Sequence, residues 1–299
     1  MKINTGQGTI PLITLIGIWS VSALTSLPGL AVSPILGELS TIFPHATELD
    51  IQMLTSLPSL LIIPFVLLAG KLAEKRDFIR LLRVGLWLFA ASGVLYLFSS
   101  RMWQLMAVSA LLGIGAGLII PLSTGLISRY FTGEYRVRQF GHSSAITNMT
   151  LVVATAVTGY LAEVHWRLPF AVYLLPLISL VLSAYLKKDA ASVTIKQAAA
   201  IIPPIQSTPV ISGKYGIHIR HLVQLMLFYG LVTYVVLVVT FNLPFLMEAH
   251  HFSSGNSGLM ISLFFLAIMA PGFMLDSLVK LLGNKTKLTA FWLLPSDYC

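Results

Sequence analysis

The side chains able to support catalysis or bind a metal are few in this chain, and they form no recognisable set. Isolated carboxylates and histidines fall near the ends of apolar stretches, at Glu38, His142, Glu163, Glu248 and Asp276. The sequence has no HExxH motif, no paired carboxylates and no Ser, His and Asp set. The His250-His251 pair has no accompanying cysteine, and the only cysteine, Cys299, is the last residue. The sequence therefore predicts no catalytic residues, no metal site and no cofactor.

The elements that must position these residues are apolar segments long enough to cross a membrane. Hydrophobic residues fill 56% of the 299 positions and charged residues only 10%, against roughly 25% charged in soluble domains. Because one crossing takes roughly 20 apolar residues, eight helices are predicted, at about residues 10–36, 51–69, 81–99, 103–128, 140–162, 168–186, 222–247 and 257–282. A stub of a ninth begins at Leu288. We therefore expect an all-α, polytopic membrane protein.

The basic residues predict how this bundle is oriented. A formal charge of +8 would suggest nucleic-acid binding if the basic residues shared one soluble face. With the N-terminus placed inside, however, all of the 19 Lys and Arg residues except Arg101 and Arg167 fall on inner segments. The positive-inside rule then predicts a cytoplasmic N-terminus in the cell membrane. The excess charge is expected to face anionic lipid rather than nucleic acid.

The longest non-apolar stretch divides the chain into two units. Residues 187–220 include Pro203, Pro204 and Pro209 and are interpreted as a central cytoplasmic linker. The segment before it, residues 1–186, is predicted to form a six-helix N-terminal half. Residues 221–299 are predicted to hold helices seven and eight and the start of a ninth.

The loop after the second predicted helix carries a motif. It reads Gly70-Lys71-Leu72-Ala73-Glu74-Lys75-Arg76-Asp77-Phe78-Ile79-Arg80 and resembles the G-x-L-A-D-R-x-G-R-K signature of the major facilitator superfamily of secondary transporters. Agreement extends to Leu27-Pro28-Gly29-Leu30, Gly113-Ile114-Gly115-Ala116-Gly117 and Trp166-Arg167-Leu168-Pro169-Phe170. The resemblance covers the chain to about Leu294 and is nearest to the bacterial multidrug-efflux branch.

The resemblance implies roles for several positions in this loop. The positions it marks for gating are Gly70, Leu72, Glu74, Arg76 and Arg80. Gly70 is expected to let the second helix approach a neighbour closely. Glu74 is expected to cap a facing helix N-terminus or pair with arginines. The alternative is an ordinary cytoplasmic loop with snorkelling lysines.

Small residues predict tight helix seams elsewhere in the bundle, at Gly113, Gly115, Gly117 and Gly159. The family often has an intramembrane arginine, associated with proton coupling, four residues before the first of these glycines. This chain has Ser109 there, and of the antiporter pattern G-P-x-x-G-G only Gly159 matches. Proton coupling therefore stays open, and a packing role for these segments is favoured.

Uncharged polar residues within the spans are the candidates for a substrate pathway. In the family the first, fourth, seventh and tenth helices line a central cavity, which by resemblance points to Thr25, Tyr229, Tyr234 and Asn242. Asn148 is a further candidate from the fifth helix. Hydrogen bonds between helices explain these residues about equally well. An apolar, aromatic path suits a small lipophilic substrate better than a sugar phosphate, which would need buried Arg or Lys.

The resemblance therefore implies a transporter that exports small lipophilic compounds by alternating access, with protons as the usual driver. An uptake carrier is an alternative, and a membrane enzyme is disfavoured by the missing catalytic set. The family has twelve helices in two halves, of which this sequence supplies eight and a stub. We therefore expect poor stability, or dependence on a dimer or on a missing C-terminal half. A partner-dependent or non-functional short form remains the other hypothesis.

Overall fold

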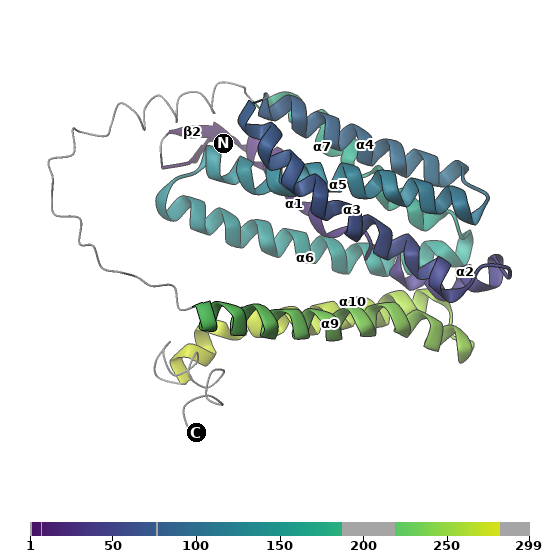
Figure 1. Cartoon of the computed structure of the whole chain (residues 1–299). Helices are drawn as coiled ribbons and strands as arrows, with labels where there is room; N and C mark the ends of the chain where they lie inside the picture. Colours follow the sequence, from purple (N-terminus) through teal and green to yellow (C-terminus); the bar gives the residue numbers. More distant parts are fainter. Residues whose placement is uncertain (1, 7, 76, 187–218, 282–299) are drawn as a thin grey trace, which may run out of the picture.

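The computed structural model describes residues 2–6, 8–75, 77–186 and 219–281, and within these residues the chain is a helical bundle (Figure 1). The all-α prediction is confirmed. The expected central linker lies outside the described residues except for its last two positions, and the expected ninth-helix stub lies outside them entirely.

A short β-hairpin precedes the first helix and was not predicted. Strands β1 (Lys2–Asn4) and β2 (Thr9–Pro11) pair antiparallel, with Ile3 opposite Ile10. The hairpin is tied to a later loop, because the Thr132 amide donates to the Thr5 carbonyl at 3.1 Å. Helix α1 (Leu12–Ala23) accordingly begins after Pro11 rather than at Ile10.

The first span is broken rather than a single helix over residues 10–36. After α1, the chain forms the 3-10 turns η1 (Leu24–Ser26) and η2 (Ser33–Ile35), and then α2 (Leu36–Ile42). Gly29 has φ +82°, a conformation that residues with a Cβ avoid. Its Cα also lies so close to α3 that an added Cβ would sit 2.7 Å from the Thr55 carbonyl oxygen. The Pro28-Gly29 turn therefore replaces helix in the middle of the span.

The other predicted spans each correspond to a helix or a broken helix. They are α3 (Glu48–Lys75), α4 (Phe78–Phe98), α5 (Met102–Tyr130), α6 (Gly133–Val164), the sequence η3 (Leu168–Leu174), α7 (Pro176–Leu182) and η4 (Ser183–Tyr185), then α9 (Ile219–Ala249) and α10 (Ser254–Leu281). Among the described residues, 6 helices are long and apolar enough to cross a membrane, and Leu12–Ser26 and Ser254–Ala267 are shorter apolar helices.

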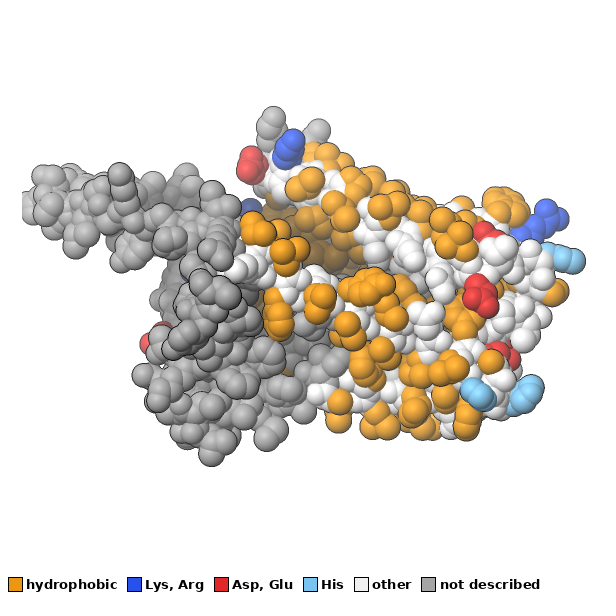
Figure 2. Space-filling model, turned by 60° about the horizontal axis from the view of Figure 1, so that its bottom comes forward, with side chains coloured by type: hydrophobic (Ala, Val, Ile, Leu, Met, Phe, Trp, Pro, Cys, Tyr) orange, Lys and Arg blue, Asp and Glu red, His pale blue; other side chains and the backbone are white. Residues whose placement is uncertain are grey.

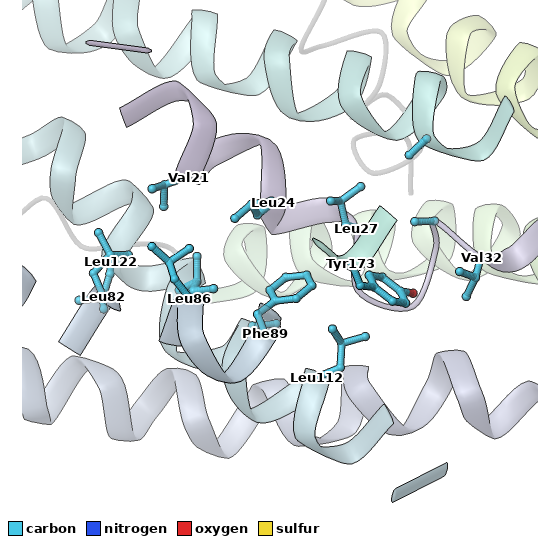
Figure 3. Packing of buried hydrophobic residues seen from close by; sticks show 14 of the residues in the cluster. Val21, Leu24, Leu27, Val32, Leu82, Leu86, Phe89, Leu112, Leu122 and Tyr173 are labelled. Carbon is cyan, nitrogen blue, oxygen red and sulfur yellow. The ribbon is translucent and has the colours of Figure 1, made fainter. Parts of the chain in front are cut away.

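The main core lies among α1, α4, α5 and the broken sixth span. Figure 3 shows Leu86 and Phe89 of α4 close to Leu24 and Leu27 of the first span, with Tyr173 of η3 beside them. A smaller cluster of Leu151, Val152, Ile261 and Phe265 joins α6 to α10. The two clusters show that α10 packs on the bundle through α6.

The outer surface has the character of a membrane protein. Large apolar side chains such as Trp87, Phe98 and Leu67 are 60%, 78% and 67% exposed. Figure 2 shows hydrophobic side chains along the length of the face, while charged and histidine side chains gather mainly at its right-hand end. A lateral apolar surface between polar ends suits burial in a bilayer.

Candidate functional site

The bundle has two ends that carry different loops. The Asp77 end holds the hairpin and residues 77–78 and 130–135, where Arg129 lies 3.9 Å over the Phe78 ring. The Arg101 end holds residues 38–47, 99–102, 163–168 and 248–256, where an Arg167 guanidinium nitrogen donates to the Ser100 hydroxyl at 2.8 Å. The two basic residues that the charge pattern separates from the rest, Arg101 and Arg167, therefore share one end.

The signature loop is organised by Asp77. Its carboxylate accepts hydrogen bonds from the Ile79 and Arg80 amides at 3.1 and 3.4 Å, which caps the N-terminus of α4. The Arg80 side chain lies on the same carboxylate at 3.4 Å and is otherwise exposed. The acidic cap in this loop therefore serves its own following helix, and it comes from the position where the family has glycine.

The remaining loop positions differ from what the resemblance implies. A Cβ added at Gly70 would meet nothing within 4 Å, so the described residues do not include a neighbour that this glycine allows to approach. Gly70 and Glu74 are one turn apart on α3, and both are exposed, while Leu72 is half-buried. Glu74 therefore does not cap a facing helix among the described residues. Arg76 lies outside them.

The glycines of α5 lie at close contacts with two different helices. An added Cβ at Gly113 would be 2.6 Å from the Pro58 carbonyl oxygen of α3, and one at Gly117 would be 2.6 Å from Cβ of Phe65. One at Gly115 would be 2.8 Å from the Phe89 amide nitrogen of α4. Alternate glycines thus place the backbone of α5 directly against α3 and α4.

A second glycine seam joins α6 to α10. A Cβ on Gly159 would be 2.6 Å from the Ser254 carbonyl oxygen, and one on Gly258 would be 2.6 Å from the Thr155 carbonyl oxygen. The hydroxyls of Thr155 and Ser262 share a buried hydrogen bond of 2.8 Å across the same seam. Gly258 and Ser262 were not singled out in the sequence, although they share a face one turn apart on a predicted span.

Two carboxylates from different elements converge on the N-terminus of α10. The Ser254 hydroxyl donates to Glu38 of α2 at 2.5 Å, and the Gly255 amide donates to Glu163 of α6 at 3.1 Å. Negative charge is favourable there because the first amides of a helix lack partners within it. We name the arrangement of Glu38, Glu163, Ser254 and Gly255 the carboxylate clamp. Sequence reasoning placed both acids at helix ends without a partner, since their partner lies about 90 to 220 positions away.

The described side chains of helix α9 contact the rest of the bundle in its C-terminal half, where Val236 and Leu243 pack against the cluster that joins α6 to α10. Of the α9 side chains that the structure describes, the buried ones are Thr240, Pro244 and Met247. A Cβ on Gly37 of α2 would lie 2.6 Å from the Pro244 carbonyl oxygen. Figure 1 shows α9 and α10 running below α6, with α9 reaching α2 at its far end. The contacts of α9 and of the start of α10 therefore meet the bundle at the Arg101 end.

The expected pathway residues are only partly brought together. Thr25 donates to the Ser22 carbonyl at 2.7 Å, and Thr147, next to Asn148, donates to the same carbonyl at 2.9 Å, so η1 and α6 cross at these positions. Asn148 is exposed and donates to the Ser144 carbonyl of its own helix. On α9, Asn242 is exposed and bonds the Val238 carbonyl, Tyr234 is 68% exposed, and the Tyr229 side chain lies outside the description.

Ser109 occupies a buried junction of three helices. Its hydroxyl lies 2.5 Å from the Tyr96 hydroxyl of α4 and donates to the Leu54 carbonyl of α3 at 3.2 Å. The Tyr96 ring stacks on Phe170, with centroids 4.5 Å apart. The position where the family often has a charge is therefore used for a neutral link between helices.

Comparison with known proteins finds a matching family and several relatives of this chain. Residues 14–296 match the family model described as Major Facilitator Superfamily. The quinolone resistance protein NorA of Staphylococcus aureus is 31% identical over 115 residues, which are 38% of this chain and 29% of that protein. The multidrug transporter protein MdtP of Bacillus subtilis is 28% identical over 147 residues, 49% of this chain and 26% of that protein. The matches thus span less than a third of either relative.

A solved structure supports the fold. The crystal structure of a D-xylose-proton symporter superposes with a TM-score of 0.61 at 16% identity, covering 89% of this chain and 68% of that one. This likeness concerns the fold alone, whereas the family model covers most of the sequence. Taken with the helical bundle and its signature loop, the match shows that this chain belongs to the major facilitator superfamily.

Proposed function

We propose that this chain acts in the export of small lipophilic compounds across the cell membrane by alternating access, with the Asp77 end in the cytoplasm. The observation that carries the proposal is the uneven contact between the six-helix unit and the α9–α10 pair. The contacts of α9 and of the first turns of α10 lie at the Arg101 end. Among the described residues, the contacts run from this end to the middle of α6, and an interface of this kind suits rocking of two units around a central site.

The contacts at the Arg101 end suit an interaction that must open and close. An acidic group at a helix N-terminus contributes roughly 0.3–1 kcal/mol at an exposed position. The carboxylate clamp provides two acidic groups, the exposed Glu163 and the half-buried Glu38, and the Gly159–Gly258 seam adds backbone contact without long interlocking side chains. Such an interface can hold one state without making the other inaccessible.

The proposed substrate class rests on the relatives and on the residues of the spans. Two relatives are a quinolone resistance protein and a multidrug transporter by name. The six-helix spans carry mostly hydroxyl and apolar side chains at depth, and the family's charge position holds Ser109. A lipophilic solute needs no buried cation for its recognition. We expect a proton gradient to drive export through residues other than Ser109.

Ethidium accumulation in a bacterial host depleted of its own efflux pumps tests this function. Cells making the chain should accumulate less dye than vector controls, and a protonophore should remove the difference. A Gly159→Leu variant, which places a side chain against the Ser254 carbonyl, should lose the effect at equal membrane levels, whereas Gly141→Leu, at an open position on the same helix, should keep it. Accumulation equal to the vector control would contradict export, and increased accumulation would indicate uptake.

The proposal includes a second copy or a complementary helical unit as partner. Apolar side chains stay exposed along α3 and α9, among them Leu60, Leu67, Leu227 and Leu231. These faces must contact lipid or protein, and a central path needs walls on both sides. Native mass spectrometry of the protein released from nanodiscs should show an assembly larger than 32.6 kDa. A transport-active monomer would contradict this part of the proposal.

A further inference from the structure

A cavity at the Arg101 end lies outside the proposed path between the units. It has a volume of about 420 Å³ and is lined by Ile42, Phe43, Pro44, His45, Ala46, Asp50, Met102, Trp103 and Met106. That volume falls within the range of small-molecule sites, roughly 300–1,000 Å³. Its walls come from the end of α2, the α2–α3 loop and the first turns of α3 and α5. We call it the α2–α5 pocket.

The lining combines an apolar body with one anionic group. Phe43, Trp103 and two methionines provide aromatic and polarizable surface. Asp50 is the only carboxylate of the lining, which contains no Lys or Arg. The Thr47 amide and hydroxyl both donate to Oδ2 of Asp50, at 2.9 and 2.8 Å. These bonds hold the carboxylate in place while Oδ1 makes no hydrogen bond to the described residues.

Phe43 in the pocket wall contacts Trp166, an aromatic residue outside the lining. Phe43 packs edge-on against Trp166 with centroids 5.6 Å apart, and the Arg167 guanidinium lies 4.8 Å from the Trp166 ring. Trp166 and Arg167 are both outside the lining. Arg101 and Glu48, which are close in sequence to lining residues, are both exposed and carry opposite charges. His45 is the one other titratable group that lines the pocket.

We propose that the α2–α5 pocket binds the cationic head and adjoining apolar body of a lipophilic cation. Asp50 supplies the counter-charge, Phe43 and Trp103 supply cation–π contacts, and Met102 and Met106 contact the apolar part. The same chemistry is shared by free amphiphilic cations and by the amine head of a zwitterionic lipid. The site does not depend on the proposed transport function, since it lies within the six-helix unit.

Protection of a cysteine from alkylation tests the pocket locally. In a Cys299→Ser background, Ala46→Cys places a thiol in the lining and Glu48→Cys places one outside it. The protein is reconstituted in phosphatidylglycerol nanodiscs at pH 8. Tetraphenylphosphonium should slow labelling at position 46 about tenfold, as expected for a bound cation, and leave position 48 unchanged. Tetraphenylborate, an anion of the same shape, should protect neither.

Removing the counter-charge completes the test. Asp50→Asn keeps an oxygen that can accept from Thr47, and it should abolish protection of position 46. Trp103→Leu should also weaken protection, and it leaves the Thr47 bonds in place. Slower labelling when phosphatidylethanolamine is added, reversed by Asp50→Asn, would assign the site to a lipid head, and no effect of this lipid would assign it to free cations. Absent protection, protection by tetraphenylborate, or protection retained in Asp50→Asn would overturn the proposal.

Discussion

The six-helix unit and the α9–α10 pair are built by different kinds of contact. In the most apolar 18-residue window of α5, 61% of residues are buried, whereas the buried side chains among those described in α9 are Thr240, Pro244 and Met247. Helix α5 meets α3 and α4 along much of its length, through backbone contacts at three glycines and a shared core. The described contacts of α9 and α10 with that unit extend from the Arg101 end to the middle of α6, and they include hydroxyls and carboxylates. The six-helix unit is therefore held by contacts among several helices, whereas the described α10 side chains join it mainly through the seam with α6.

The largest expected effect is on the stability of the six-helix unit. Gly113→Ala would bring a Cβ within 2.6 Å of the Pro58 carbonyl oxygen, a backbone atom that cannot move aside without shifting α3. We expect a loss of about 1–3 kcal/mol in the free energy of unfolding, as for overpacking in other interiors. The matched control is Gly70→Ala, which meets open space and should be neutral or raise stability by about 0.5–1 kcal/mol through helix propensity. Thermal unfolding of the purified variants, followed by intrinsic fluorescence, gives both values, and equal midpoints would refute the distinction.

The next prediction tests the seam between α6 and α10 without disturbing the core of the six-helix unit. Gly159→Leu should push α10 from α6 while leaving the core of the six-helix unit folded, because Gly159 faces Ser254 and Gly258. In a Cys299→Ser background, a Thr155→Cys, Ser262→Cys pair should form a disulfide readily, since the native hydroxyls are 2.8 Å apart. Gly159→Leu should reduce that cross-link about fivefold or more, corresponding to an overpacking cost of about 1 kcal/mol or more.

The control for this experiment lies on the same helix. A Cβ on Gly141 meets nothing within 4 Å, so Gly141→Leu should leave the cross-link unchanged. If both leucines lower it equally, α6 as a whole is perturbed and the seam is not the cause. If neither lowers it, the backbone contact at Gly159 does not hold α10 in place.

A smaller effect is expected at the junction of α3, α4 and α5. Ser109→Ala removes a hydroxyl that bonds both Tyr96 and the Leu54 carbonyl in a fully buried place. We expect a loss of about 1 kcal/mol in unfolding free energy. A double-mutant cycle with Tyr96→Phe measures how much belongs to the pair, and the coupling should be about 0.5–1.5 kcal/mol. A coupling of zero would mean that the two hydroxyls do not interact.

The sequence predicted the helices better than it predicted their partners. Apolar length alone located every described span, because a bilayer requires continuous helical backbone. It did not predict the break within the first span, where the Pro28-Gly29 turn lies in close contact with Thr55 of α3. It also missed the β-hairpin at residues 2–11, which is held by Thr132. Both features are stabilised by residues distant in the chain.

The contacts of the candidate site residues were also hard to predict, because they too depend on residues distant in the chain. Glycines on a helix indicate close packing, and Gly113, Gly115, Gly117 and Gly159 lie at close backbone or side-chain contacts. Gly70 has the same residue type and meets open space, since the type does not reveal what lies opposite. The partners of Glu38 and Glu163 could not be predicted, because the α10 N-terminus reaches them only through the tertiary fold. Many polar residues in the spans bond carbonyls of their own helix, as Asn148 and Asn242 do, so residue type cannot mark a pathway.

The smallest predicted effect tests whether charge at the seam adds to its packing. Glu163→Gln removes the negative charge from the Gly255 amide but keeps an oxygen able to accept the 3.1 Å bond. The Thr155→Cys, Ser262→Cys cross-link should fall about two- to fivefold at low salt, matching 0.3–1 kcal/mol for an acid at a helix N-terminus. High salt should shrink this difference, because exposed charges are screened. Glu134→Gln, at the far end of α6, should change nothing. A salt-independent loss would assign the role of Glu163 to hydrogen-bond geometry, and the carboxylate clamp would then hold α10 by shape rather than by charge.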